Sequence, residues 1–235
     1  MIAKKRIWLA QVNSLFGRSC FLPYSCGILQ AYAQSIPEIR EAYDFCGFAF
    51  IREPIEDVVR RMGRVDVFGG SVYCWNAAYT LALAKAVKEA NPGCLVVLGG
   101  PHVPNKSEGY FVKHPFADVL VHGEGEETFA ELLLGRIGLH GPVDGISFKG
   151  CSSSTVKTNP RPRKDNLDEL PSPYLTGVFD ELMRQPYEFH ASQETHRGCP
   201  FPARCATGDR PSSRRSRSLV TKDSSRNSSG LPICG

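Results

Sequence analysis

The sequence predicts a doubly wound α/β domain, in which helices cover both faces of a parallel sheet. Short apolar runs alternate with helical segments throughout residues 1–150. Helical connections of about 10–15 residues imply parallel strands joined by right-handed crossovers. The runs are also almost continuously apolar, as expected of strands that are buried on both faces.

The expected strands are the apolar runs themselves, and several of them end in glycine. Glycine after an apolar run is typical of a chain that leaves a sheet and turns. The predicted strands are residues 6–12, 43–50, 65–72, 95–98 and 117–121, with residues 144–149 as an added edge strand.

The segments between these strands have the caps and the periodicity of helices. Pro54 begins a helix whose apolar side chains share one face, and Gly63 ends it. Asn76 is the expected N-cap of an alanine-rich helix that runs to Ala90. Further helices are expected at residues 26–34 and 126–134, and a short one at residues 178–184.

Composition excludes several classes of protein. No apolar run reaches the ~18 residues that a membrane span needs. The basic N-terminus lacks the cleavage pattern of a signal peptide, so we expect a cytoplasmic protein without a membrane partner. Nine cysteines in such a chain suggest thiols or metal ligands rather than a disulfide framework.

The net charge of +4 is concentrated at the C-terminal end of the chain. Residues 197–235 carry eight Lys or Arg and two Asp, a net charge of +6, which leaves −2 for residues 1–196. The body therefore lacks the electrostatic footprint of a nucleic-acid-binding domain. The basic end has no interleaved aromatic residues, so it predicts non-specific, salt-sensitive contact at most.

The chain is expected to have three parts. Residues 1–150 form the α/β domain. Residues 151–196 are a polar, proline-bearing linker that leads into a further region. Residues 197–235 end in a tail rich in serine and arginine, without apolar periodicity, which we expect to be disordered from about Arg210 onward.

Three predicted strands end in segments that suit a flat ligand. They run into residues 69–76, 99–102 and 122–128. Open parallel sheets bind ligands at the carboxyl ends of their strands, and glycine lets a ligand approach the backbone closely. Neither GxGxxG nor a Walker motif follows the first strand, so a wide shelf is expected rather than a phosphate loop.

Each of these features also has an ordinary interpretation. Two glycines after a buried strand are a common turn signal. Glu124 and Glu126 suit the start of any helix, where they face the positive end of its dipole. His102 and His122 also fit ordinary loop histidines. Only the order and the spacing of the segments are specific.

In combination, these segments resemble the cobalamin-binding domain of B12-dependent radical-SAM enzymes. The resemblance covers residues 6–202 and lies in residues 70–76 (GSVYCWN), 97–102 (VLGGPH), 123–129 (GEGEETF) and 167–174 (LDELPSPY), the last being similar to the family's inter-domain segment. It implies a Rossmann-like fold with a corrinoid lying on the strand ends. The implied contact residues are Ser71, Val72, Tyr73, Trp75, Asn76, Gly99, Gly100, Pro101, His102, Gly123, Glu124, Gly125 and Glu126.

One departure concerns the cobalt ligand. Classical B12 domains use a DxHxxG motif, whose histidine displaces the lower base and ligates cobalt. Residues 13–17 (NSLFG) stand at that place and contain no histidine. The resemblance therefore implies cobalamin binding without that axial ligand.

A second departure concerns the iron–sulfur cluster. Residues 197–201 (RGCPF) resemble the opening of the family's CxxxCxxC motif, whose three thiolates hold a [4Fe–4S] cluster that chelates S-adenosylmethionine. Cys199 fits the first position. Ala203 and Ala206 stand at the other two, and the next thiol is Cys205.

We therefore expect a corrinoid-binding domain without its catalytic barrel, in a reading frame that is truncated or frameshifted at this motif. Two alternatives stay open. One is a working enzyme with an atypical cluster on Cys199 and Cys205. The other is a flavodoxin-like module for a different flat ligand, or an apo interaction domain. A corrinoid spectrum and the iron content distinguish the three.

Overall fold

The computed structural model describes residues 3–135, 143–150, 154–164, 166–197 and 217–218. The chain forms two compact units, one of residues 1–163 with 170–192 and the other of residues 164–169 with 193–235. Residues 170–192, which fall within the stretch expected as a linker, thus belong to the unit that holds the sheet.

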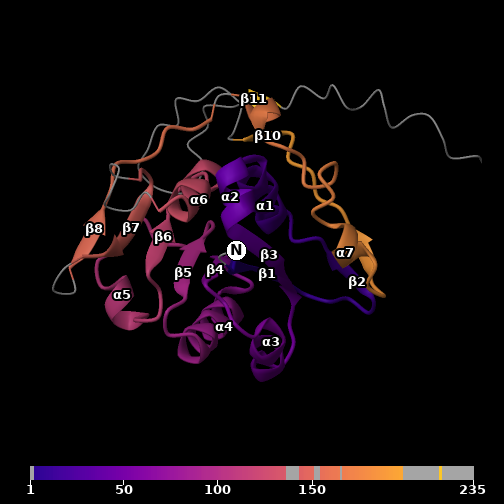
Figure 1. The fold of residues 1–235 in the computed structure, drawn as a ribbon, viewed down its shortest axis with the longest axis horizontal. Helices are drawn as coiled ribbons and strands as arrows, with labels where there is room; N and C mark the ends of the chain where they lie inside the picture. Colours follow the sequence, from indigo (N-terminus) through magenta and orange to yellow (C-terminus); the bar gives the residue numbers. More distant parts are fainter. Residues whose placement is uncertain (1–2, 136–142, 151–153, 165, 198–216, 219–235) are drawn as a thin grey trace, which may run out of the picture. The chain divides into compact units, whose positions relative to one another are not determined.

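The first unit is built on a seven-stranded sheet, which confirms the predicted α/β class (Figure 1). Five strands are parallel, and two antiparallel strands extend one end of the sheet. In spatial order the strands are β3 (Tyr43–Ile51), β1 (Lys5–Asn13), β4 (Val67–Ser71), β5 (Leu95–Gly99), β6 (Val119–Val121), β7 (Ile146–Lys149) and β8 (Thr155–Lys157).

The outermost strand of the sheet differs from the prediction. The strand expected at the edge, residues 144–149, is β7, and β8 lies outside it. No sequence pattern predicts β8, because its three residues are too few to show a period. The chain winds from β1 to β3 on one side and to β4 on the other, so the strand order reverses between β1 and β4. Ligands of open α/β sheets bind at that reversal.

Helices cover both faces of the sheet (Figure 1). Helices α1 (Tyr24–Ser35) and α6 (Glu126–Leu133) lie against each other on one face, and α3 (Ile55–Met62) and α4 (Ala77–Ala90) on the other. Two further helices are short: α2 (Pro37–Ala42) lies between α1 and β3 along the chain, and α5 (Tyr110–Lys113) lies between β5 and β6.

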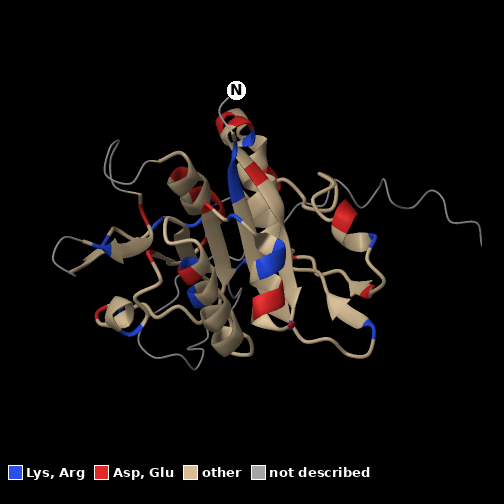
Figure 2. Cartoon of the chain, turned by 60° about the horizontal axis from the view of Figure 1, so that its bottom comes forward, with Lys and Arg blue, Asp and Glu red and all other residues tan. Residues whose placement is uncertain are grey.

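The core has two layers, one on each face of the sheet. Leu9 and Val97 pack on the side of α1, whereas Phe68 and Leu98 pack on the side of α3 and α4. Charged residues of both signs lie mainly on the helices and loops, and the strands are largely free of them (Figure 2). Burial of these apolar side chains is what stabilises the sheet and fixes the positions of its strand ends.

Residues 170–192 pack around the first helix. Phe179 is fully buried, and its ring lies 5.8 Å from that of Phe48. A Cβ at Gly27 would stand 2.2 Å from the Phe179 ring, so α1 accepts this ring only because residue 27 is glycine. Behind Phe179 the chain forms α7 (Asp180–Met183) and β9 (Glu188–His190), which pairs in parallel with β2 (Ser19–Phe21).

The second unit is small in its described part. It contains the 3-10 turn η2 (Leu167–Glu169) and an antiparallel pair, β10 (His196–Arg197) with β11 (Arg217–Ser218). Apart from these last two residues, the tail that we expect to be disordered lies outside the described residues. No described helix is long and apolar enough to cross a membrane.

Candidate cofactor site

The turn between β4 and α4 is closed by one buried side chain. Asn76 is 1% exposed, accepts a hydrogen bond from the backbone N–H of Tyr73 (2.8 Å) and donates one to the carbonyl oxygen of Ser71 (3.1 Å). The predicted N-cap role is wrong in this respect. Asn76 occupies the cap position of α4, but its side chain makes no cap hydrogen bond because both ends of its amide are used by the turn.

The turn after β4 is joined to the turn after β5. The N–H of Val72 donates to the carbonyl oxygen of Gly99 (2.7 Å), and the N–H of His102 donates to that of Val72 (3.1 Å). Gly100 has φ +107, and a Cβ there would lie 2.6 Å from the Val72 oxygen. This close approach requires glycine at residue 100.

An aromatic pair stands on the first of these turns. The rings of Tyr73 and Trp75 stack at 4.5 Å with an angle of 17°, and Trp75 is 53% exposed. Arg52, at the end of β3, donates to the Trp75 carbonyl oxygen (2.6 Å). The Tyr73 hydroxyl lies 2.6 Å from the Ser25 hydroxyl, and the N–H of Ser25 donates to Gln11 (2.8 Å).

The turn between β6 and α6 is the third part of the site. Gly123 is exposed with φ +80, and nothing lies within 4 Å of the position of a Cβ there. His122 lies 2.8 Å from the Ser147 hydroxyl, which also accepts a hydrogen bond from Ser107 (2.9 Å). Burial, with a contribution from Lys157, lowers the pKa of His122 and so favours the neutral form of this imidazole.

The three turns lie at the carboxyl edge of one sheet and differ in how they present their residues. Trp75, Gly100, Pro101, His102 and Gly123 are exposed. Tyr73, Gly99, Glu124 and Gly125 are half-buried. The side chains of Ser71, Val72, Asn76 and Glu126 are buried, so these residues shape the turns instead of presenting side chains to solvent.

This arrangement fits a flat macrocycle. Gly123 has open space where a Cβ would stand, the backbone at Gly100 is exposed, and the exposed indole of Trp75 offers an apolar face. Asn13, at the end of β1, is buried and donates to the carbonyl oxygen of Phe21 (3.1 Å). At the end of the first strand, the Asn13 amide is already hydrogen-bonded within the protein. No histidine stands there, in agreement with the missing DxHxxG motif.

Sequence reasoning missed the residues that support the turns from elsewhere. Gln11, Ser25 and Arg52 come from β1, α1 and the end of β3. A glutamine within an apolar strand was the one available signal. The candidate metal ligands Cys199 and Cys205 lie outside the described residues, and the described part of the chain contains no cluster of three His, Cys, Asp or Glu that could hold a metal ion.

Comparison with known families decides the class of the domain. Residues 38–133 match the model of the B12 binding domain, a segment that includes the turns after β4 and β5 and the start of α6. The chain contains a B12-binding domain. The predicted resemblance is thereby confirmed.

Two relatives share more of the chain. It is 39% identical over 188 residues to a 2-(S-pantetheinyl)-carbapenam-3-carboxylate methyltransferase of Streptantibioticus cattleyicolor. It is 40% identical over 188 residues to the cobalamin-dependent radical SAM methyltransferase TokK of Streptomyces tokunonensis. Each match covers 77% of this chain but only 28% of the relative, so this chain spans under a third of the length of those enzymes.

A solved structure has the same fold. The cobalamin-dependent S-adenosylmethionine radical enzyme OxsB, with aqua-cobalamin and S-adenosylmethionine bound, superposes with a TM-score of 0.64 at 19% identity. The match covers 92% of this chain and 30% of OxsB. At this identity the likeness establishes the fold of the B12-binding domain and leaves the chemistry to its residues.

Proposed function

We propose that this chain binds a corrinoid on the shelf formed by residues 70–76, 99–102 and 123–126. The observation that supports the proposal most is the contact of Gly100 with Val72. This contact holds the turn after β5 against the turn after β4, which carries the exposed Trp75. The shelf lies in a domain of the B12-binding family, at the edge where open α/β sheets hold ligands.

Each part of the shelf has a distinct task in this proposal. The backbone at Gly100 and Gly123 lets the ring approach, and the indole of Trp75 contacts its apolar surface. His102 and Glu124 stand at the rim, where they can hydrogen-bond the amide groups of a corrin. Arg52 and Asn76 hold the turn that carries Trp75. When bound, the corrinoid would supply the methyl-transfer chemistry of its cobalt.

We further propose that the chain is the cobalamin-binding domain of a B12-dependent radical-SAM-type protein, the class to which its relative TokK belongs, and that it acts in the cytoplasm. The second part of this proposal agrees with the free thiols at Cys20, Cys26, Cys46, Cys74 and Cys94. A [4Fe–4S] cluster with S-adenosylmethionine is what the resemblance to radical-SAM enzymes implies. For this chain, Cys199 and Cys205 remain the proposed ligands of an atypical cluster, and iron and sulfide analysis of purified protein tests them directly.

The ligand class is tested by incubating the protein separately with hydroxocobalamin and with FMN, desalting it and recording the visible spectrum. We expect close to one corrinoid per chain and no retained flavin. The Gly100→Ala variant should retain much less corrinoid, whereas Gly93→Ala, in an open turn away from the shelf, should retain as much as the parent. Retention of FMN without cobalamin would instead favour a flavodoxin-like module.

A further inference from the structure

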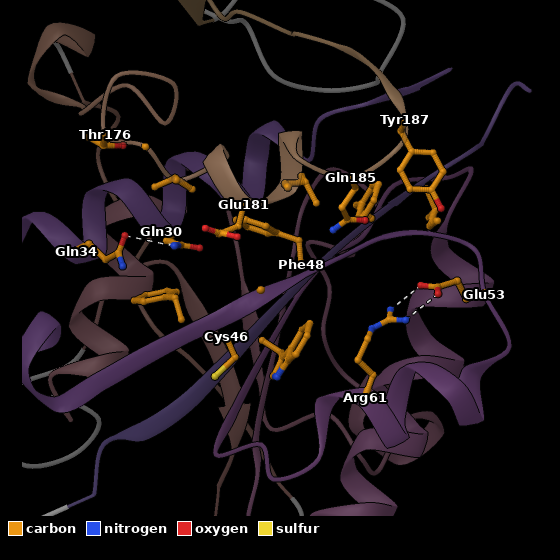
Figure 3. Close-up of a pocket in the computed structure, with 18 residues that line it drawn as sticks. Gln30, Gln34, Cys46, Phe48, Glu53, Arg61, Thr176, Glu181, Gln185 and Tyr187 are labelled. Carbon is orange, nitrogen blue, oxygen red and sulfur yellow. Dashed lines mark hydrogen bonds and ion pairs between the residues drawn. The ribbon is translucent and has the colours of Figure 1, made fainter. Parts of the chain in front are cut away.

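A groove of about 680 Å³ runs along the outer edge of β3, at the opposite end of the sheet from β6 (Figure 3). Among the described strands, β3 pairs only with β1. The register of that pair shifts at Cys46, because Ile7 is opposite Phe45 while Trp8 is opposite Gly47. This bulge bends the edge of the strand and opens it toward the groove.

The lining and the volume of the groove resemble those of small-molecule sites. Five aromatic side chains line it, Trp8, Phe45, Phe48, Phe50 and Tyr187. Its volume falls within the range of about 300–1,000 Å³ that is typical of ligand pockets, in which aromatic walls surround a few polar groups. The groove lies within the first compact unit and shares no residue with the corrinoid shelf.

Two polar groups in the groove are buried and incompletely bonded, the indole N–H of Trp8 and the amide of Gln30. Gln30, on α1, is 8% exposed, and its Nε2 donates to Gln34 at 3.3 Å. Its Oε1 finds no hydrogen-bond partner among the described residues. Turning the amide over would exchange the two atoms, since nitrogen and oxygen are assigned from such networks, and would still leave one end of the amide unpaired. Leaving a buried polar group unpaired is costly, and a ligand that bonds to it removes that cost.

The charges in the groove are already neutralised. Arg61 makes a two-pronged ion pair with Glu53, at 2.8 and 2.6 Å, and Arg184 pairs with Glu181 beside it. Figure 3 shows the Gln30 amide and the Glu181 carboxylate on the same side of β3, with the Arg61–Glu53 pair on the other. The lining residues of the groove therefore offer no unpaired cation, which disfavours an anionic ligand.

We propose that this groove is a second ligand site, for a flat, uncharged ring compound that hydrogen-bonds to the unpaired end of the Gln30 amide. The aromatic walls supply contact area for the ring, and the unpaired amide favours a ligand with a hydrogen-bonding group. The proposal does not depend on corrinoid binding, because the groove and the shelf use different residues.

The probe is indole-3-acetamide, with indole-3-acetate as its anionic counterpart. Both are titrated into the isotope-labelled full-length chain and followed by amide chemical shifts. We expect saturable shifts at residues 30–34 and 45–51, with a dissociation constant of about 1 mM, as usual for a ligand of this size. Indole-3-acetate should bind at least about fivefold more weakly, because Arg61 is already paired with Glu53 and the lining residues offer the probe's carboxylate no unpaired cation. Equal affinity for the two probes, or shifts at the shelf instead, would overturn the proposal.

The Gln30→Leu variant tests the role of the amide. It should weaken indole-3-acetamide binding at least about fivefold and leave hydroxocobalamin uptake unchanged, whereas Gln193→Leu, which makes the same chemical change outside the groove, should alter neither. Gln30→Met serves if the first variant does not fold. Unchanged or tighter probe binding by the Gln30 variant contradicts the proposal, and loss of corrinoid in the parent chain bears only on the shelf.

Discussion

Gly100 lies so close to Val72 that a Cβ on residue 100 would stand 2.6 Å from the Val72 carbonyl oxygen. The same carbonyl accepts a hydrogen bond from His102, and the Val72 N–H donates to Gly99. These contacts hold the turn after β4 and the turn after β5 against each other. The position of the proposed corrinoid shelf depends on this contact.

Gly100→Ala should disturb that contact. At φ +107 an alanine is strained, and its methyl group would meet backbone that cannot move aside, so we expect a loss of about 1–3 kcal/mol in the free energy of unfolding. Corrinoid affinity should fall at least about tenfold. Urea denaturation and a cobalamin titration measure the two effects. Gly93→Ala is the control, and equal behaviour of the two variants would show that the contact is unimportant.

Trp75→Ala should separate binding from folding. The side chain is 53% exposed, so its removal should cost no more than about 1 kcal/mol of stability, most of it from the stack on Tyr73. Corrinoid affinity should drop about tenfold or more because the ring loses its apolar contact. Val112→Ala, at a 77% exposed position on α5, is the matched control. Unchanged affinity in Trp75→Ala would place the corrinoid elsewhere.

Asn76→Ala should destabilise the domain through its backbone partners. Removing this amide leaves the Tyr73 N–H and the Ser71 carbonyl without their partner in a buried turn, at a cost of about 2–4 kcal/mol. Asn105→Ala, at an exposed asparagine, should change stability by less than about 0.5 kcal/mol. Thermal or urea unfolding of the pair gives the comparison, and a small effect at residue 76 would mean that the turn holds without its amide.

The cysteines should differ sharply in reactivity. Burial raises the pKa of Cys94 to about 12 and raises that of Cys26 further, whereas Cys74 is exposed on the shelf. Because the thiolate is the reactive form, iodoacetamide at pH 8 should modify Cys74 well before either buried thiol. Peptide mass spectrometry measures the rates. Methylcobalamin should slow labelling of Cys74, and an unchanged rate with corrinoid bound would contradict the placement of the cofactor.

Stability should fall as the solution becomes acidic. The pKa values of His122 and His114 are lowered from 6.5, in both cases first by burial and then by a neighbouring lysine. The unfolded chain therefore takes up protons at a higher pH than the folded chain, and the free energy of unfolding decreases as pH drops below about 6.5. Urea midpoints at pH 7.5 and 5.5 test this. The double variant His122→Asn, His114→Asn should lose less on acidification, and an identical loss would assign the effect to other groups.

Much of the fold could be predicted because the central strands are buried on both faces and read as apolar runs. The five parallel strands and their helices occur within a few residues of the expected places. The elements that were missed are short. The three residues of β2 and of β9 cannot show a period, and their pairing joins segments about 170 residues apart. The packing of Phe179 onto Gly27 depends on a missing side chain, which periodicity does not reveal.

The site could be predicted only in part for a similar reason. Glycines after buried strands predict turns, and the structure has the three expected turns after β4, β5 and β6. The residues that hold those turns act across the fold. Arg52 reaches the Trp75 backbone and Ser25 reaches the Tyr73 hydroxyl, 23 and 48 positions along the chain. Such contacts depend on strand order, which no local pattern contains.

Hydrogen exchange with and without hydroxocobalamin tests the central claim most directly. Peptides covering residues 70–76, 99–102 and 123–126 should exchange more slowly when the corrinoid is bound, while peptides from α3 and from the groove beside β3 should not change. Protection elsewhere, or bound corrinoid without protection of these three turns, would contradict the proposed shelf.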